Sequence, residues 1–223
     1  MDIHQGSDVE IGLLLIFWYG ILHAFGPDHL TAIADFSIGK GRKKTLFITF
    51  AFALGHGLSL FVFAKILQSV ELSDDILSYG DIVSSSVIVA IGIYLLYMAA
   101  SDRINIAKHM HEGKEHIHIW FGKSHDHNDA DFKKRTASAL TVGALMGIGG
   151  VRGMLVTLSA IAHNEVNLWM VLSFTLGVMV IFMGFGFFLA LVNDNLLTNR
   201  RNVRAAFATA GAVSLLVGGQ MLF

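Results

Sequence analysis

Four side chains near the amino terminus have the types and spacing to bind a transition metal. His23, Asp28 and His29 lie in the segment HAFGPDHL on either side of Pro27, and His56 follows in LGHGLS. Neutral imidazole combined with carboxylate suits a borderline divalent ion such as Ni²⁺, Co²⁺ or Zn²⁺. Because imidazole must be neutral to bind, metal loading is expected to compete with protons.

Pro27 has to reshape its helix before these side chains can converge. On an ideal helix, Asp28 and His29 point about 140° and 240° away from His23, so the three share no face. Proline has no N–H, and the carbonyl that it leaves unpaired four residues earlier belongs to His23. With Gly26 beside it, we expect a kinked or unwound turn in which the side chains meet and the free His23 carbonyl faces the same cavity.

The same residues have a second interpretation, as polar groups bonded between helices or as a helix end at the membrane interface. An aspartate in mid-membrane costs about 2.5–3.5 kcal/mol on insertion scales, so it is seldom kept without a purpose. Four ionisable residues in two neighbouring segments, beside the only proline of the chain, favour a functional site.

Composition indicates that lipid surrounds these segments. Of the 223 residues, 54% are hydrophobic and 15% are charged, against about 25% charged in soluble domains. A net charge of -1 gives no reason to expect a nucleic-acid partner, and the lack of cysteine excludes a thiolate metal site.

Six apolar segments are each long enough to cross a hydrocarbon core of about 30 Å as a helix. We therefore expect an all-α, polytopic membrane protein with six transmembrane helices, at Ile11–Phe36, Thr45–Gln68, Ile82–Ala100, Ala137–His163, Leu168–Val192 and Val203–Phe223.

Loop charges predict the orientation of these helices. The first, third and fifth loops carry clusters of Lys and Arg, such as GKGRKK after the first helix, whereas the second and fourth carry none. Basic loops stay in the cytoplasm. We therefore predict a multi-pass protein of the cytoplasmic (inner) membrane with both termini outside.

The chain divides into a three-helix half at 1–100, a cytoplasmic loop at 101–136 and a second three-helix half at 137–223. Three helices per half make the halves enter the membrane from opposite sides, as in a 3+3 inverted repeat. Each half opens with a helix interrupted by glycine, at GPDH and at GIGGVRG. Corresponding broken helices point to a central binding site.

The third loop is rich in histidine, in three His-x-His pairs. Residues two apart lie on one side of an extended chain, so each pair can chelate, and a tract of this kind is typical of metal binding. The loop is therefore a candidate accessory metal site, formed by His109, His111, His116, His118, His125 and His127.

Arg152 lies in GIGGVRG, within the fourth predicted helix. A cation inside a membrane normally has a partner. One hypothesis is that Arg152 pairs with Asp28 when no metal is bound and acts as a gating or counter-ion residue. The alternative is a structural pairing with carbonyl groups freed by the neighbouring glycines.

The H-x4-DH segment at His23, Asp28 and His29, with the Gly-His-Gly segment at His56, resembles the nickel/cobalt transporter family. It looks especially like the shorter urease-accessory-type permeases and nickel/cobalt efflux proteins. The resemblance covers the first two helices and implies that these four residues are needed to transport Ni²⁺ or Co²⁺. The chain departs from the longer importers in having GIGGVRG where they carry an acidic or Asp-Thr segment.

We thus expect a secondary transporter of Ni²⁺ or Co²⁺ that works in uptake, with the metal as substrate and no prosthetic group. Export fed by the histidine-rich loop is the closest alternative, and an intramembrane metalloenzyme or a metal sensor is a third. We do not expect an enzyme, because the spans hold no glutamate as a general base. The expected partners are the metal and the lipid bilayer, with a homo-oligomer left open.

Overall fold

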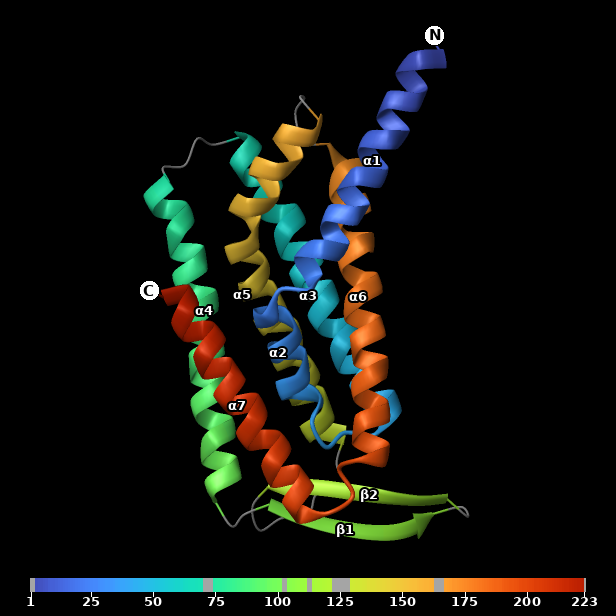
Figure 1. Cartoon of the computed structure of the whole chain (residues 1–223), viewed down its shortest axis with the longest axis vertical. Coiled ribbons are helices and arrows are strands. Elements are labelled where there is room, and N and C mark those ends of the chain that lie inside the picture. The colour runs from blue at the N-terminus through green and yellow to red at the C-terminus, as the bar shows by residue number, and fades with distance from the viewer. Residues whose placement is uncertain are drawn as a thin grey trace.

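The computed structural model describes residues 3–69, 74–101, 104–111, 114–121, 129–162 and 167–222. Seven helices and one two-stranded hairpin make up these segments (Figure 1). In chain order they are α1 (Ile3–Ala24), α2 (Pro27–Ser37), α3 (Arg42–Ser69), α4 (Asp74–Ala100), β1 (Ile104–His111), β2 (Lys114–Phe121), α5 (Asp129–Ala162), α6 (Leu168–Asn195) and α7 (Arg200–Leu222).

The long apolar helices support a membrane protein. Four of them, α3, α4, α6 and α7, contain stretches that are long and apolar enough to cross a bilayer. Helices α1 and α2 form a fifth span if the bent pair is counted as one. The predicted helix at Ala137–His163 corresponds to α5 of the structure, and six spans stay a prediction.

The predicted helix at Ile11–Phe36 is broken where the sequence indicated. Helix α1 ends at Ala24, α2 begins at Pro27, and their axes differ by 60°. Proline suits the first position of a helix because its missing N–H would have no partner there. Phe25 and Gly26 form the break. The amino end of α2 therefore begins inside the bundle.

The His23 carbonyl is not free, contrary to the expectation from Pro27. The backbone N–H of Gly26 donates to it at 3.0 Å. The chain tightens into a shorter turn at the end of α1, and this turn supplies the donor that the proline lacks.

Helix α1 packs closely against α6, its neighbour in Figure 1. A side chain on Gly20 would overlap the carbonyl of Phe174, and one on Gly177 would overlap the carbonyl of Phe17. Small residues allow helix backbones to approach closely in membranes, where van der Waals packing drives association. The two glycines therefore set the distance between α1 and α6.

Helices α3 and α5 meet in the same way. A side chain on Gly55 would overlap the carbonyl of Leu140, and one on Gly143 would overlap the carbonyl of Phe52. A third close pair joins α4 to α7, where Gly92 and Gly211 face each other's carbonyl groups. Three glycine-lined contacts thus hold the bundle around α2.

The first, third and fifth loops gather at one end of the bundle, opposite the amino terminus (Figure 1). Asn193, in the last turn of α6, binds the first of them. Its Nδ2 donates to the carbonyl oxygens of Ser37 at 2.7 Å and Lys40 at 3.1 Å, and its Oδ1 accepts from the N–H of Gly39 at 3.0 Å. Gly39 has φ of 73°, a conformation that glycine adopts without steric cost.

The predicted third loop contains the antiparallel hairpin β1–β2, an element that the expected all-α fold did not include. Its sequence alternates apolar and polar residues, as strands do when one face is covered. Ile104, Ile106 and Ile119 pack against a core cluster of α4 and α7. The hairpin therefore lies with one face on the end of the bundle where the first, third and fifth loops gather. We call this end the basic end, after the Lys and Arg residues of these loops.

Candidate metal centre

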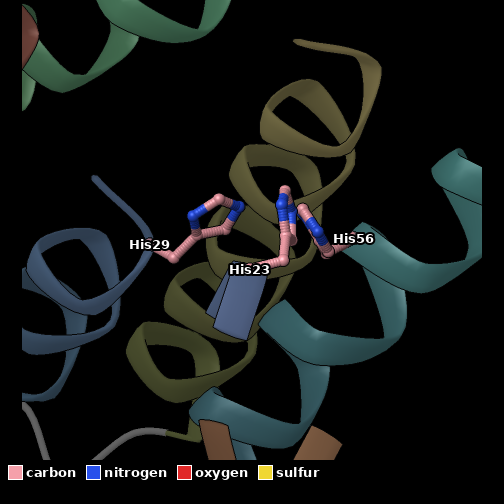
Figure 2. A group of neighbouring side chains, drawn as sticks. All are labelled: His23, His29 and His56. Atoms are coloured by element: carbon pink, nitrogen blue, oxygen red, sulfur yellow. The ribbon is translucent and has the colours of Figure 1, made fainter. Parts of the chain in front are cut away.

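Three of the four predicted ligands meet in the interior of the bundle. One ring nitrogen from each of His23, His29 and His56 lies within 4.8 Å of the other two. His23 is on α1, His29 on α2 and His56 on α3, and Figure 2 shows their rings facing one another beside α5. The bend at Gly26 is what lets His23 and His29 meet, since they would point apart on one straight helix.

Four of the six ring nitrogens in this group have no hydrogen-bond partner. They are Nε2 of His23, Nε2 of His29 and both nitrogens of His56, and all are buried. Most buried polar groups in folded proteins are hydrogen-bonded, and leaving one unpaired costs about 1–3 kcal/mol. Four unpaired ring nitrogens gathered in one buried place are explained by a ligand that binds nitrogen, such as a metal ion.

Asp28 stands behind His29 and not among the converging atoms. Its Oδ1 lies 2.8 Å from Nδ1 of His29. A carboxylate only accepts hydrogen bonds, so Nδ1 carries the proton and Nε2 keeps its lone pair. Carboxylates commonly orient metal-binding histidines in this way and raise their basicity.

Asp28 also offsets the field of its own helix. It lies in the first turn of α2, whose amino end faces the interior. The amino end of a helix carries a partial positive charge that opposes a cation and favours an anion. A negative side chain here makes the neighbourhood of the three histidines more favourable for a divalent metal.

Glycines leave the room that these side chains occupy. A Cβ on Gly26 would lie 2.5 Å from Oδ1 of Asp28 and 2.8 Å from Nδ1 of His29. A Cβ on Gly150 of α5 would lie 3.3 Å from Cε1 and 3.4 Å from Nε2 of His23. Gly150 belongs to the GIGGVRG segment, so the second half contributes space and not a ligand at this position.

Aromatic rings close the centre against water. Phe174 lies beside His23, with ring centroids 5.2 Å apart, and Phe182 lies 5.7 Å from both His29 and His56. Both phenylalanines belong to α6 and are fully buried. A dry surrounding strengthens the interaction of the ring nitrogens with a cation.

The geometry fits a metal after a small contraction. Nitrogen ligands lie about 2.0–2.1 Å from a bound zinc-like ion, so ligand nitrogens are roughly 3–4 Å apart. The three histidines would therefore move closer by about 1 Å. Three nitrogen ligands leave at least one coordination position open in a tetrahedral ion and more in an octahedral one.

The remaining predicted metal residues lie in and beyond the hairpin. The backbone register pairs His109 with His116 and sets His118 opposite Ala107. Since alternate positions of a strand share a face, positions 109, 111, 116 and 118 fall on the face opposite Ile104, Ile106 and Ile119. The last pair, His125 and His127, and the side chain of Arg152 lie outside the described residues, so the gating role of Arg152 stays a prediction.

One buried acid was not singled out from the sequence. Asp35, on α2, is 7% exposed and touches Ser214 of α7. Its only sequence signal is that it is a charged residue within an apolar span.

No protein-family profile, curated protein or solved structure matches the chain, so the interpretation of the site depends on its geometry.

Proposed function

We propose that this protein is a secondary transporter that carries Ni²⁺ or Co²⁺ across the cytoplasmic membrane, in the direction of uptake. The observation that supports it most is the group of unpartnered ring nitrogens of His23, His29 and His56 inside a bundle of apolar helices. Metal binding would satisfy those nitrogens. The break between α1 and α2 would allow His29 to move relative to His23.

The ligand set suits a substrate that must leave again. Neutral imidazoles prefer borderline ions such as Ni²⁺, Co²⁺ and Zn²⁺ over Mg²⁺ or Ca²⁺, which require oxygen ligands. With three protein ligands, the ion keeps open positions through which water or another donor can enter during release. The carboxylate of Asp28 tunes this centre through His29 without holding the ion directly.

An inverted repeat of the two halves is supported by the glycine contacts. Phe17 and Gly20 of α1 meet α6 as Leu140 and Gly143 of α5 meet α3. The spacing within each pair is the same, and the partner residues Phe174 and Gly177 correspond equally to Phe52 and Gly55. Exchanging the two halves therefore reproduces these two contacts, as is expected of an inverted repeat.

The correspondence leaves the metal centre in one half only. It pairs His23 with Met146 and His56 with Val178, and it pairs His29 with Arg152. Met146 and Val178 are buried and apolar, and arginine repels a cation. We infer a single substrate site that lies away from the pseudo-symmetry axis. We also infer six membrane spans, with the hairpin on the cytoplasmic side.

The position of the hairpin is compatible with either direction of transport. The positive-inside rule puts the basic end of the bundle in the cytoplasm. A histidine-bearing hairpin there would receive metal after uptake, and it would equally supply metal for export. Uptake agrees with the resemblance to permeases, and export is the alternative outcome of the test.

Flux of radiolabelled Ni²⁺ into proteoliposomes tests the proposal, with the His23→Ala variant beside the wild type. We expect flux in the wild type and none in the variant, with Ser59→Ala as a control that leaves the three histidines intact. Absence of flux in the wild type would defeat transport and favour a sensor or an enzyme. In cells that express the protein, metal content above that of empty cells supports uptake, and a lower content supports export.

A further inference from the structure

Asp35 is a second buried acid on the helix that carries His29. It lies about 9 Å farther along α2, at 1.5 Å per residue, toward the basic end of the bundle. The residue is 7% exposed, and its Oδ1 is buried without a hydrogen-bond partner. No Lys, Arg or His nitrogen of the described residues forms an ion pair with it. An ionised carboxylate in such a place is costly.

The contacts of Ser214 indicate that Asp35 carries a proton. The Ser214 Oγ is fully buried and lies 2.9 Å from Oδ2 of Asp35 and 2.9 Å from the carbonyl oxygen of Ala210. A hydroxyl has one hydrogen to donate. If Asp35 were ionised, both neighbours of the hydroxyl would be acceptors, and one contact would have no hydrogen. With a proton on Oδ2, Asp35 donates to Ser214, and Ser214 donates to Ala210.

A cavity connects this pair to the basic end of the bundle. It has a volume of about 100 Å³, and its walls include Phe207 of α7 and Ile119 of the hairpin. Since one water needs at least about 10–15 Å³ of such space, the cavity has room for several. Water there could take a proton from Asp35 or return one.

The other charged groups of the cavity argue against a metal ion as its occupant. Among the described residues, the titratable side chains that line it besides Asp35 are Lys40, Tyr94 of α4 and Arg135 of α5. The helices α3, α6 and α7, also packed around α2, contribute none. Two basic side chains repel a divalent cation, whereas they would stabilise the carboxylate after its proton has left.

We propose that Asp35, together with Ser214, is a proton-binding site that exchanges its proton with this cavity as metal enters and leaves the histidine centre. The inference rests on the proposed transport function and names its coupling ion. On deprotonation the O–H bond of Asp35 breaks, the proton passes to water in the cavity, and the carboxylate remains. A divalent ion at His29 attracts that negative charge, so metal binding favours proton release.

The same step changes the contact between the broken helix and α7. The contact between Asp35 and Ser214 joins α2 to α7 by a side-chain hydrogen bond. When the proton leaves, the Ser214 hydroxyl becomes the donor to the carboxylate in place of its bond to Ala210. The contact between α2 and α7 therefore changes its donor when Asp35 loses its proton. Proton release and the metal ligand His29 are thereby linked through one short helix.

Infrared spectra of the purified protein in nanodiscs test the proton site without any transport. We expect a carboxylic-acid carbonyl band near neutral pH that disappears in Asp35→Asn. The band should persist in Asp194→Asn, which changes an exposed acid of α6, and should shift in Ser214→Ala because a hydrogen bond is lost. A spectrum in which Asp35→Asn removes no such band overturns the proton site.

Proteoliposomes containing a pH-sensitive dye test the coupling. Wild-type protein should move protons when Ni²⁺ moves, and Asp35→Asn should lower this proton flux to the level of protein-free liposomes while exchange of labelled Ni²⁺ continues. Proton flux that persists in Asp35→Asn, or Ni²⁺ flux without protons in the wild type, overturns the coupling. Wild-type vesicles without Ni²⁺ flux refute the transport function and the coupling together, and the infrared band then decides the proton site by itself.

Discussion

Oδ1 of Asp28 lies 2.8 Å from Nδ1 of His29, and this contact determines which nitrogen of the ring is available to a metal. Asp28→Asn keeps the size of the side chain but removes its charge, and its amide can donate to Nδ1 and leave the proton on Nε2. Loss of such a supporting carboxylate typically weakens metal binding about 10–100-fold. We expect Ni²⁺ affinity, measured by calorimetry on the purified protein, to fall by that amount. An unchanged affinity would show that Asp28 does not orient the ligand.

His56 is expected to destabilise the metal-free protein. Both of its ring nitrogens are buried without partners, at about 1–3 kcal/mol for each unsatisfied group. His56→Leu should therefore raise the thermal unfolding temperature without metal and abolish the increase that Ni²⁺ gives the wild type. The control Ser59→Ala should keep that increase. A metal-free His56→Leu protein less stable than the wild type would contradict this account.

Gly150 leaves space for the ring of His23, and a branched side chain there should displace it. A Cβ at this position already lies 3.3 Å from Cε1 of His23, so Gly150→Val adds methyl groups where the ring lies. We expect loss of Ni²⁺ binding at the three membrane histidines, with the helical content unchanged. Gly184→Val is the matched control, because a Cβ on Gly184 has nothing within 4 Å. Equal Ni²⁺ binding by both variants would exclude this packing.

The proposed repeat predicts equal costs at corresponding glycines. Gly20→Ala and Gly143→Ala each place a methyl group against a neighbouring carbonyl, of Phe174 and Phe52 respectively. Overpacking of this kind costs about 1–3 kcal/mol. The two variants should lower the unfolding temperature by similar amounts, and Gly219→Ala, which meets open space, should not lower it. A large effect at one position and none at the other would count against the repeat.

The histidine-rich loop should bind metal independently of the membrane centre. Replacing all six of its predicted ligands by alanine should lower the number of Ni²⁺ ions bound at equilibrium dialysis and leave the intramembrane site occupied. The complementary variant, His23→Ala with His29→Ala and His56→Ala, should retain only the ions bound by this loop. If the six-alanine protein binds as many ions as the wild type, the histidine-rich segment is not a metal site.

The convergence of His23 with His29 could be predicted because its cause is local. Pro27 lacks a donor whatever surrounds it, so a break beside Gly26 follows from the sequence alone. The partner of the His23 carbonyl could not be predicted, since it depends on how tightly the chain turns at Gly26. The alternation of Ile104 and Ile106 is typical of a strand, but the apolar surface of α4 and α7 that covers these residues exists only in the folded protein.

Other features depend on which helices become neighbours. The position of Asp28 behind His29, and not among the ligands, follows from the direction in which α2 leaves the break. Asp35 and Ser214 lie at opposite ends of the sequence, and only the packing of α2 on α7 brings them together. Hydrophobic periodicity identifies helices in a membrane protein, but it carries little information on helix partners, because lipid-facing and buried faces are both apolar.

The pairing of α1 with α6 also has a consequence for biosynthesis. A nascent chain that has emerged only as far as α5 already contains all three histidines, but it lacks Phe174 and Phe182, which cover the centre. It also lacks Asn193, which ties the first loop to α6. The α3–α5 pair can assemble at that stage, whereas α1 has to wait in the bilayer for its partner. The group of three histidines is therefore enclosed only after α6 has been synthesised.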